Sequence, residues 1–258
     1  VFQEGLRTDP KNIALYTGID QVLSILQHPP QERVVALEQY PDHANLPTLL
    51  VYELILNLAE SGEFEKAAAL FHNRFFQREE GGTNVRQVWL EVQVQRASSL
   101  AQGGKCPEAV RIVDHLADPV ADLAFTHDGL EPFLRSARFR FLLGTIYKGC
   151  NLPEKAQANL KQAADRSNFE DAIWAWKASQ QIPNSDLSAG RQKLQSILEK
   201  VKNSGDSSPS GWWLYNAGML DSALGNTELA DKEFRQALLS PDSLMTYHLT
   251  RLAVSGGL

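Results

Sequence analysis

The feature that most constrains the fold is a pattern of paired helices that recurs along the chain. Its clearest copy begins with Leu50, Leu54 and Leu58, whose four-residue spacing places them on one face of a helix. A turn at Gly62 follows, and Ala67 opens a second helix. Small residues at such positions let the two backbones of a hairpin approach closely. The pattern therefore predicts an all-α protein built from antiparallel helical hairpins.

The pattern recurs along the chain, but the interval between successive copies varies. Aligned on the alanine that opens each second helix, four good copies and a weaker one at Ala189 fall at Ala67, Ala109, Ala156, Ala189 and Ala230. Only the step from Ala156 to Ala189 is close to a standard repeat of about 34 residues. Most of the additional residues lie in two connections between hairpins, Phe75 to Thr83 and Ala117 to Leu130. Such insertions often gather on the binding face of a repeat protein.

Helices are also expected outside these copies. The first residues predict the end of a helix that Pro10 stops, because the residue before a proline disfavours helical geometry. Apolar spacing predicts a helix from Asn12 to Leu26, a partner at Gln31 to Tyr40, and a last helix at Ser243 to Val254. A capping pair indicates a helix start at Asn84.

The expected organisation is one continuous stack with a single flexible connection. Residues 1–202 are expected to form helical repeats, and residues 212–258 a final hairpin with a terminal helix. Between them, residues 203–211 are rich in serine and glycine, a composition typical of a loop.

With these repeats, the chain resembles the tetratricopeptide-repeat family over nearly its whole length. Residues 45–165 further resemble the C-terminal repeat half of large bacterial proteins that carry an N-terminal β-sandwich domain of unassigned function. That resemblance rests on Phe71 to Arg86, Arg111 to Leu116 and Asp128 to Arg135. The usual aromatic of the first helix is replaced by Val51, Gln93 and Arg140. The resemblance implies a right-handed superhelical stack, an α-solenoid, and transfers no catalytic activity to this chain.

Charge and composition narrow the classes of partner. Hydrophobic residues make up 43% of the chain and charged residues 22%, which is typical of a folded protein. The net charge of −6 disfavours a dedicated nucleic-acid binder, whose phosphate contacts require clustered Lys and Arg. Without a long apolar run, no membrane span is expected. A cytoplasmic location is expected.

No cofactor or metal site is expected. The six histidines show none of the spacings of a zinc enzyme. Cys106 and Cys150 lack Cys-x-x-Cys spacing and indicate neither a zinc site nor a disulfide framework, so they are expected to be buried or half-buried thiols. A superficial hydrolase motif at Gly205–Ser207 lies in the flexible connection, without the preceding strand that such a nucleophile needs.

The stretch Phe71 to Trp89 is the strongest candidate for a site, because it combines charge, aromatic residues and two glycines that can adopt positive φ. Arg96 and Gln93 occupy positions where the repeat pattern expects apolar residues. On the helix two hairpins along, Arg135 and Arg138 are expected to share a face. The candidate ligand-binding residues are Asn73, Arg74, Glu79, Glu80, Asn84, Arg86, Arg96, Arg135 and Arg138.

Two interpretations of this residue set compete. In one, the set lines a polar pocket at the mouth of the groove and binds an anionic ligand. In the other, which we weight more heavily, the arginines form an internal network with Glu79, Glu80 and Glu91, because buried arginines need carboxylate partners.

At the level of function, the sequence favours a non-catalytic binding and assembly module. Its concave groove would hold a peptide, a protein partner or an adjacent domain of its own full-length chain. One alternative is an accessory part of a carbohydrate-active enzyme, or an α/α-toroid enzyme with an acidic and arginine-containing pocket near residues 73–96. Another is homo-oligomerisation through the ends of the stack.

Overall fold

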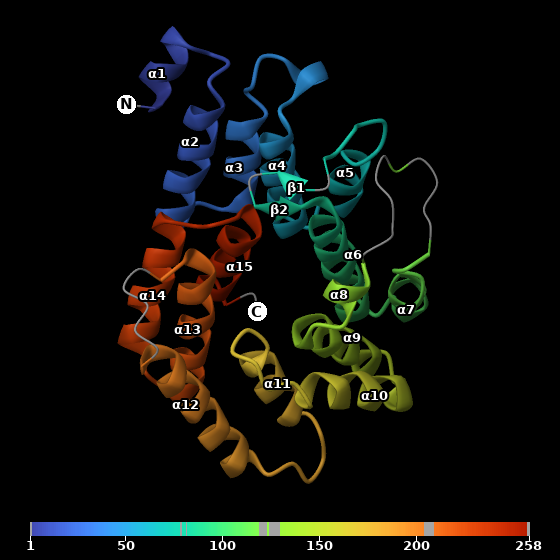
Figure 1. Ribbon diagram of the computed structural model, residues 1–258. Helices are drawn as coiled ribbons and strands as arrows, with labels where there is room; N and C mark the ends of the chain where they lie inside the picture. Colours follow the sequence, from blue (N-terminus) through green and yellow to red (C-terminus); the bar gives the residue numbers. More distant parts are fainter. Residues whose placement is uncertain are drawn as a thin grey trace. The chain divides into compact units, whose positions relative to one another are not determined.

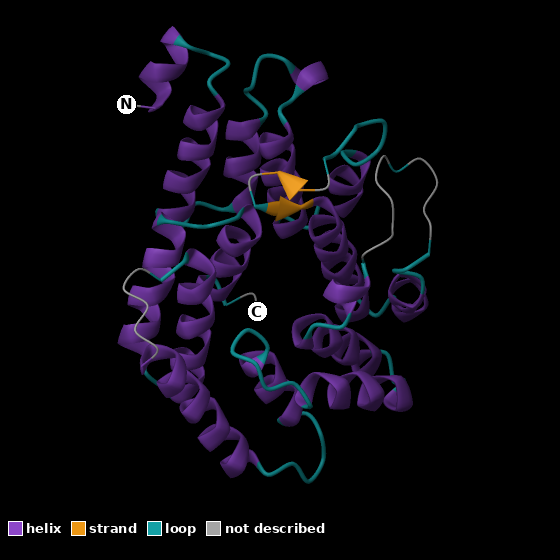
Figure 2. Cartoon of the chain, in the orientation of Figure 1, coloured by secondary structure: helices purple, strands orange, loops and turns teal. Residues whose placement is uncertain are grey.

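The prediction of an all-α protein is confirmed. The computed structural model describes residues 2–77, 79–80, 82–118, 123, 130–203 and 209–256. Over these residues the elements joined by loops and turns are helices, apart from one short strand pair and an isolated β-bridge (Figures 1 and 2). It divides into two compact units. The first comprises the described residues of Val1–Arg96 and Asp118–His127, and the second those of Ala97–Ala117 and Asp128–Leu258.

In the first unit, each helix packs against its neighbours along the chain. Contacts join α1 to α2, α2 to α3, α3 to α4 and α4 to α5, and α2 also contacts α4. The helix α4 is the core of this unit, since every residue from Leu50 to Ala59 is buried. The bounds are α1 (Phe2–Thr8), α2 (Ile13–Ile25), α3 (Pro30–Leu37), the 3-10 helix η1 (His43–Asn45), α4 (Thr48–Glu60) and α5 (Phe64–Ala69).

A two-stranded hairpin, which the sequence did not indicate, lies in the insertion that follows α5 (Figure 2). Strand β1 (Glu79–Glu80) pairs antiparallel with β2 (Thr83–Asn84). Gly82 has a positive φ of 70°, as expected for this turn, and Gly81 lies outside the described residues. The long helix α6 (Val85–Gln102) begins directly after β2, which confirms the predicted start at Asn84.

The second unit repeats a regular order of helix contacts. Within the pairs, α9 packs on α10, α11 on α12 and α13 on α14; each second helix then contacts the next first helix. First helices also touch in succession, α9 with α11, α11 with α13 and α13 with α15. The bounds are α7 (Cys106–Asp114), α8 (Glu131–Leu134), α9 (Ala137–Gly149), α10 (Pro153–Ala164), α11 (Ala172–Ser179), α12 (Leu187–Asn203), α13 (Gly211–Leu224), α14 (Thr227–Leu239) and α15 (Leu244–Val254).

The small residues of the repeat pattern lie where paired helices cross. A Cβ placed on Gly144 of α9 would meet the Leu160 side chain at 2.8 Å, and one on Gly218 of α13 would meet the Phe234 ring at 2.7 Å. The turn after α13 uses Gly225 with a φ of 91°, where a side chain would be strained. These contacts explain why the second helix of each pair lies so close to the first. Of the predicted connections, most of 117–130 and residues 204–208 lie outside the described residues.

Candidate functional site

In the insertion after α5, Arg74 has a structural contact. Its Nη1 donates a hydrogen bond of 2.6 Å to the backbone carbonyl of Leu46. Burial lowers the pKa of Arg74 below its usual value, although the guanidinium still carries its charge at neutral pH. Its neighbour Asn73 is exposed, with a left-handed φ of 54°, and Phe75 is 76% exposed. Arg74 thus ties the insertion to the loop before α4.

The other predicted residues of the insertion lie around the start of α6. The Asn84 Oδ1 accepts a hydrogen bond of 3.0 Å from the backbone N–H of Arg86, which caps the helix. Arg86 itself is only 4% exposed. The side chains of Glu79 and Glu80 lie outside the described part of the chain. Their contribution to a polar pocket therefore stays a prediction.

Arg96, near the middle of α6, pairs with a carboxylate outside the predicted set. Its Nη2 forms an ion pair with Glu65 of α5, whose side chain is 78% exposed. We had expected Glu79, Glu80 or Glu91 as the partner. An arginine–carboxylate ion pair between two helices is the kind of contact that the internal-network interpretation predicts.

Arg135 and Arg138 lie in different environments, so the expectation of a shared helix face is wrong. Arg135 follows α8 and precedes α9; its exposed side chain forms an ion pair of 2.6 Å with Glu131. Arg138 lies within α9 and is 8% exposed. The physical reason is Ser136, whose side chain caps α9 and so places the helix start between the two arginines.

Arg138 instead belongs to a seam between the first helices α9 and α11. Its Cζ lies 5.6 Å from the centroid of the buried Trp174 ring, and the Lys177 Nζ lies 5.0 Å from that ring. Phe141 packs against Trp174 with ring centroids 5.6 Å apart. Both cations therefore sit within cation–π distance of one indole.

Polar residues continue this seam toward the C-terminal end of α9. The Lys148 Nζ donates a hydrogen bond of 3.2 Å to the Gln181 Oε1, and the Gln181 amide donates one of 3.4 Å to the Thr145 Oγ1. Thr145 and Lys148 are exposed. We define the α9–α11 seam as Arg138, Phe141, Thr145, Lys148, Trp174, Lys177 and Gln181.

The charge of the two seam helices is one-sided. Neither α9 nor α11 contains an Asp or a Glu, whereas together they contain Arg138, Arg140, Lys148 and Lys177. Burial and the positive charge of Arg138 lower the pKa of Lys177. Lys148 and Lys177 were not among the predicted site residues. The absence of Asp and Glu from two successive first helices is the sequence feature that could have indicated them.

A second polar cluster lies in a cleft of about 430 Å³ lined by α12, α13 and the start of α14. Lys202 of α12 forms ion pairs with the buried Asp221 and, at 3.3 Å, with Glu233 of α14. Burial, reinforced by Asp221 and opposed by Lys202, raises the pKa of Glu233 to about 7. This cluster joins three helices through two carboxylates that share one lysine.

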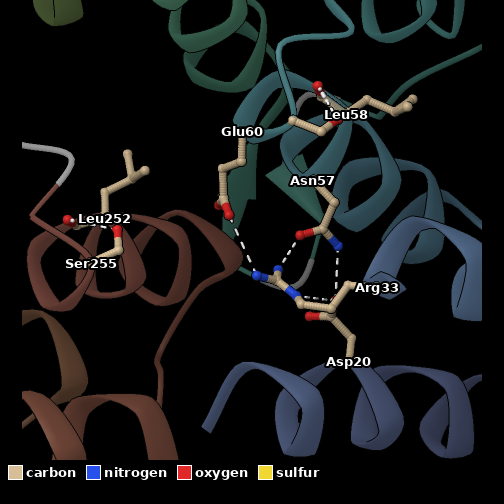
Figure 3. Close-up of polar contacts among 8 residues, drawn as sticks. Asp20, Arg33, Asn57, Leu58, Glu60, Leu252 and Ser255 are labelled. Carbon is tan, nitrogen blue, oxygen red and sulfur yellow. Dashed lines mark hydrogen bonds and ion pairs between the residues drawn. The ribbon is translucent and has the colours of Figure 1, made fainter. Parts of the chain in front are cut away.

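The first unit contains a buried polar network that links three helices (Figure 3). The Arg33 Nε of α3 donates a hydrogen bond of 3.0 Å to the Asp20 Oδ1 of α2, which also accepts one of 2.8 Å from Asn57 of α4. Arg33 further bonds Asn57 and pairs with Glu60 at 3.4 Å. Arg33 is 3% exposed and Asp20 is fully buried. The network therefore stabilises the packing of α2, α3 and α4 and is not exposed to a ligand.

Cys106 and Cys150 form a disulfide with their Cα atoms 5.3 Å apart, so the prediction of two thiols is wrong. Their separation of 44 residues carries no pairing signal in the sequence. The two residues meet because α7, which begins at Cys106, packs against α9, which ends beside Cys150.

Among the described residues, no group of three His, Cys, Asp or Glu side chains could hold a metal ion. No helix that the structure describes is long and apolar enough to cross a membrane. Comparison of the chain with protein-family models, curated proteins and solved structures finds no match.

Proposed function

We propose that this chain is a non-catalytic binding module of the tetratricopeptide-repeat type, whose α9–α11 seam binds a protein or peptide partner. The proposal includes a right-handed superhelical stack of hairpins, with first helices on its inner surface. Its support is the order of contacts in the second unit, where successive first helices touch each other and each second helix contacts the next first helix.

The observation that carries the binding surface is the composition of the seam. A helix face that only stabilises the fold is expected to bury apolar residues and to balance its exposed charges. Here an aromatic pair is flanked by cations, and the exposed Lys148 has the neutral partner Gln181. The opposite helix of the same hairpin, α10, has charges of both signs.

Steric variants test the surface without altering its charge. Thr145→Trp places a large ring on the exposed side of α9, whereas Gln162→Trp places the same ring on an exposed position of α10. Each variant and the parent chain would be used as bait in extracts of the source cells, and the retained proteins compared. We expect at least one protein to be retained by the parent and by Gln162→Trp but lost with Thr145→Trp. Equal retention by both variants would refute the assignment of the surface.

A further inference from the structure

The disulfide of the second unit lies between two exposed turns. The turn before α7, Gln102 to Lys105, is exposed, and so are Pro107 and Glu108 in the first turn of that helix. Cys106, between them, is half-buried and bonded to Cys150, which follows α9 and is half-buried as well. We infer that this disulfide is a redox switch: a dithiol reductant breaks it in the folded chain and so releases the N-terminal end of α7 from α9.

A reductant can reach this disulfide from solvent. Thiol–disulfide exchange requires an attacking thiolate to approach one of the two sulfur atoms, and exposed disulfides are the ones that are reduced most readily. The residues that flank the bond are exposed, Lys105 and Pro107 on one side and Gly149 and Asn151 on the other. The bond is therefore accessible without unfolding of the helices.

The position of Cys106 favours it as the leaving sulfur. Cys106 is the first residue of α7, a helix of nine residues, and it follows Lys105. A helix N-terminus and a neighbouring lysine both stabilise a thiolate, and a more stable thiolate leaves faster. Glu108, in the same first turn, offsets the charge of the lysine, so the helix N-terminus is the net contribution. Attack at Cys150 is therefore the favoured route.

The exchange takes two steps. One thiolate of the reductant attacks the Cys150 Sγ, the S–S bond breaks, and the Cys106 sulfur leaves as a thiolate. The second thiol of the reductant then attacks the reductant's own sulfur in the mixed disulfide and releases the Cys150 thiolate. The two thiolates take up the protons that the reductant has lost. The protein thus gains two electrons and two protons, and the reductant becomes a disulfide.

The opposite end of α7 has contacts that reduction leaves in place. Asp114, its last residue, accepts a hydrogen bond of 2.6 Å from the Tyr147 hydroxyl and forms an ion pair of 2.7 Å with Lys155. The buried residues of the helix, Ala109 and Val113, also lie beyond its first turn. With one end released and the other held, α7 opens from its N-terminal end, by local unfolding of its least buried turn. The switch operates whether or not the seam binds a partner.

Amide hydrogen exchange, followed by NMR in the intact chain, tests the switch. The reporter is the Ala109 amide, whose hydrogen bond of 3.1 Å closes the first turn of α7. The matched control is the Ala230 amide, whose bond of 3.0 Å does the same in α14, in a hairpin without cysteine. Exchange would be measured before and after incubation with dithiothreitol, in the parent chain and in Cys106→Ser/Cys150→Ser. Thiol alkylation would report reduction, and circular dichroism would report the helices.

We expect dithiothreitol at neutral pH to release both thiols while the helices persist. The Ala109 amide should then exchange about tenfold faster, and the Ala230 amide should be unchanged. In Cys106→Ser/Cys150→Ser, the Ala109 amide should exchange at the faster rate from the start and should not respond to the reductant. Reduction that requires a denaturant, an unchanged Ala109 amide after reduction, or equal acceleration at Ala109 and Ala230 would overturn the inference.

Discussion

Cys106, the first residue of α7, and Cys150, at the C-terminal end of α9, are joined by a disulfide. The bond closes a loop that includes the long connection between hairpins, and closing that loop in the unfolded chain reduces its conformational entropy. Disulfides persist mainly in oxidising compartments, so the bond argues against the cytoplasmic location that we expected.

Replacing both cysteines with alanine should destabilise the second unit. For a loop of 44 residues, the chain-entropy estimate is a loss of about 4 kcal/mol in the free energy of unfolding. Chemical denaturation of the parent chain and of Cys106→Ala/Cys150→Ala would measure the loss. Adding a reductant should affect only the parent. Rapid thiol alkylation in the source cells would test the compartment, because two free thiols would contradict the oxidised form.

The buried Glu233 should make stability depend on pH. Its pKa is raised from 4.5 to about 7, so between these values the folded chain holds a proton that the unfolded chain has released. Stability therefore falls as pH rises through this window. Glu233→Gln should lack that fall and, at pH about 8, should exceed the parent by about 3 kcal/mol. Thermal melts from pH 5 to 8 would measure this, with the exposed Glu228→Gln as the control; parallel profiles for parent and Glu233→Gln would contradict the prediction.

The network of Arg33 should be far more sensitive to mutation than a surface ion pair. Arg33→Met leaves Asp20 buried without its cation, at an expected cost of about 3–5 kcal/mol. Lys11→Met removes an exposed pair with Asp42 and should cost about 0–1 kcal/mol. Urea denaturation compares the two variants. A loss below about 1 kcal/mol for Arg33→Met would mean that water or another cation satisfies Asp20.

The close crossing of α13 and α14 gives a packing prediction. Gly218→Val would place its Cβ against the Phe234 ring and should cost about 1–3 kcal/mol. Gly149→Ala, at the end of α9, meets no atom within 4 Å and should be neutral or slightly stabilising. If the two variants had equal melting temperatures, the helices would not be in contact as described.

Helical periodicity predicted much of the fold, because it depends on local spacing. The start of α6 was located by its capping residue Asn84, and Pro10 marked the end of α1. The short strand pair β1–β2 was not predicted, since strands of two residues show no alternation that could be recognised.

The site was harder to predict, because it depends on contacts between distant segments. The Arg96–Glu65 pair and the disulfide follow from the docking of helices, which single-helix patterns do not encode. Trp174 is buried in the core, whereas Trp176, two residues along the same helix, is half-buried beside Gly190. Lys148 and Lys177 become one surface only when α9 and α11 lie side by side.

Site-specific photo-crosslinking tests the central claim, binding at the α9–α11 seam, most directly. A photoreactive residue would replace Thr145 on the seam or, as the matched control, Gln162 on α10, and the source cells would be irradiated. We expect a protein adduct at Thr145 that Lys148→Glu removes, and little or none at Gln162. An equal adduct at Gln162, or an adduct at Thr145 that survives Lys148→Glu, would contradict it.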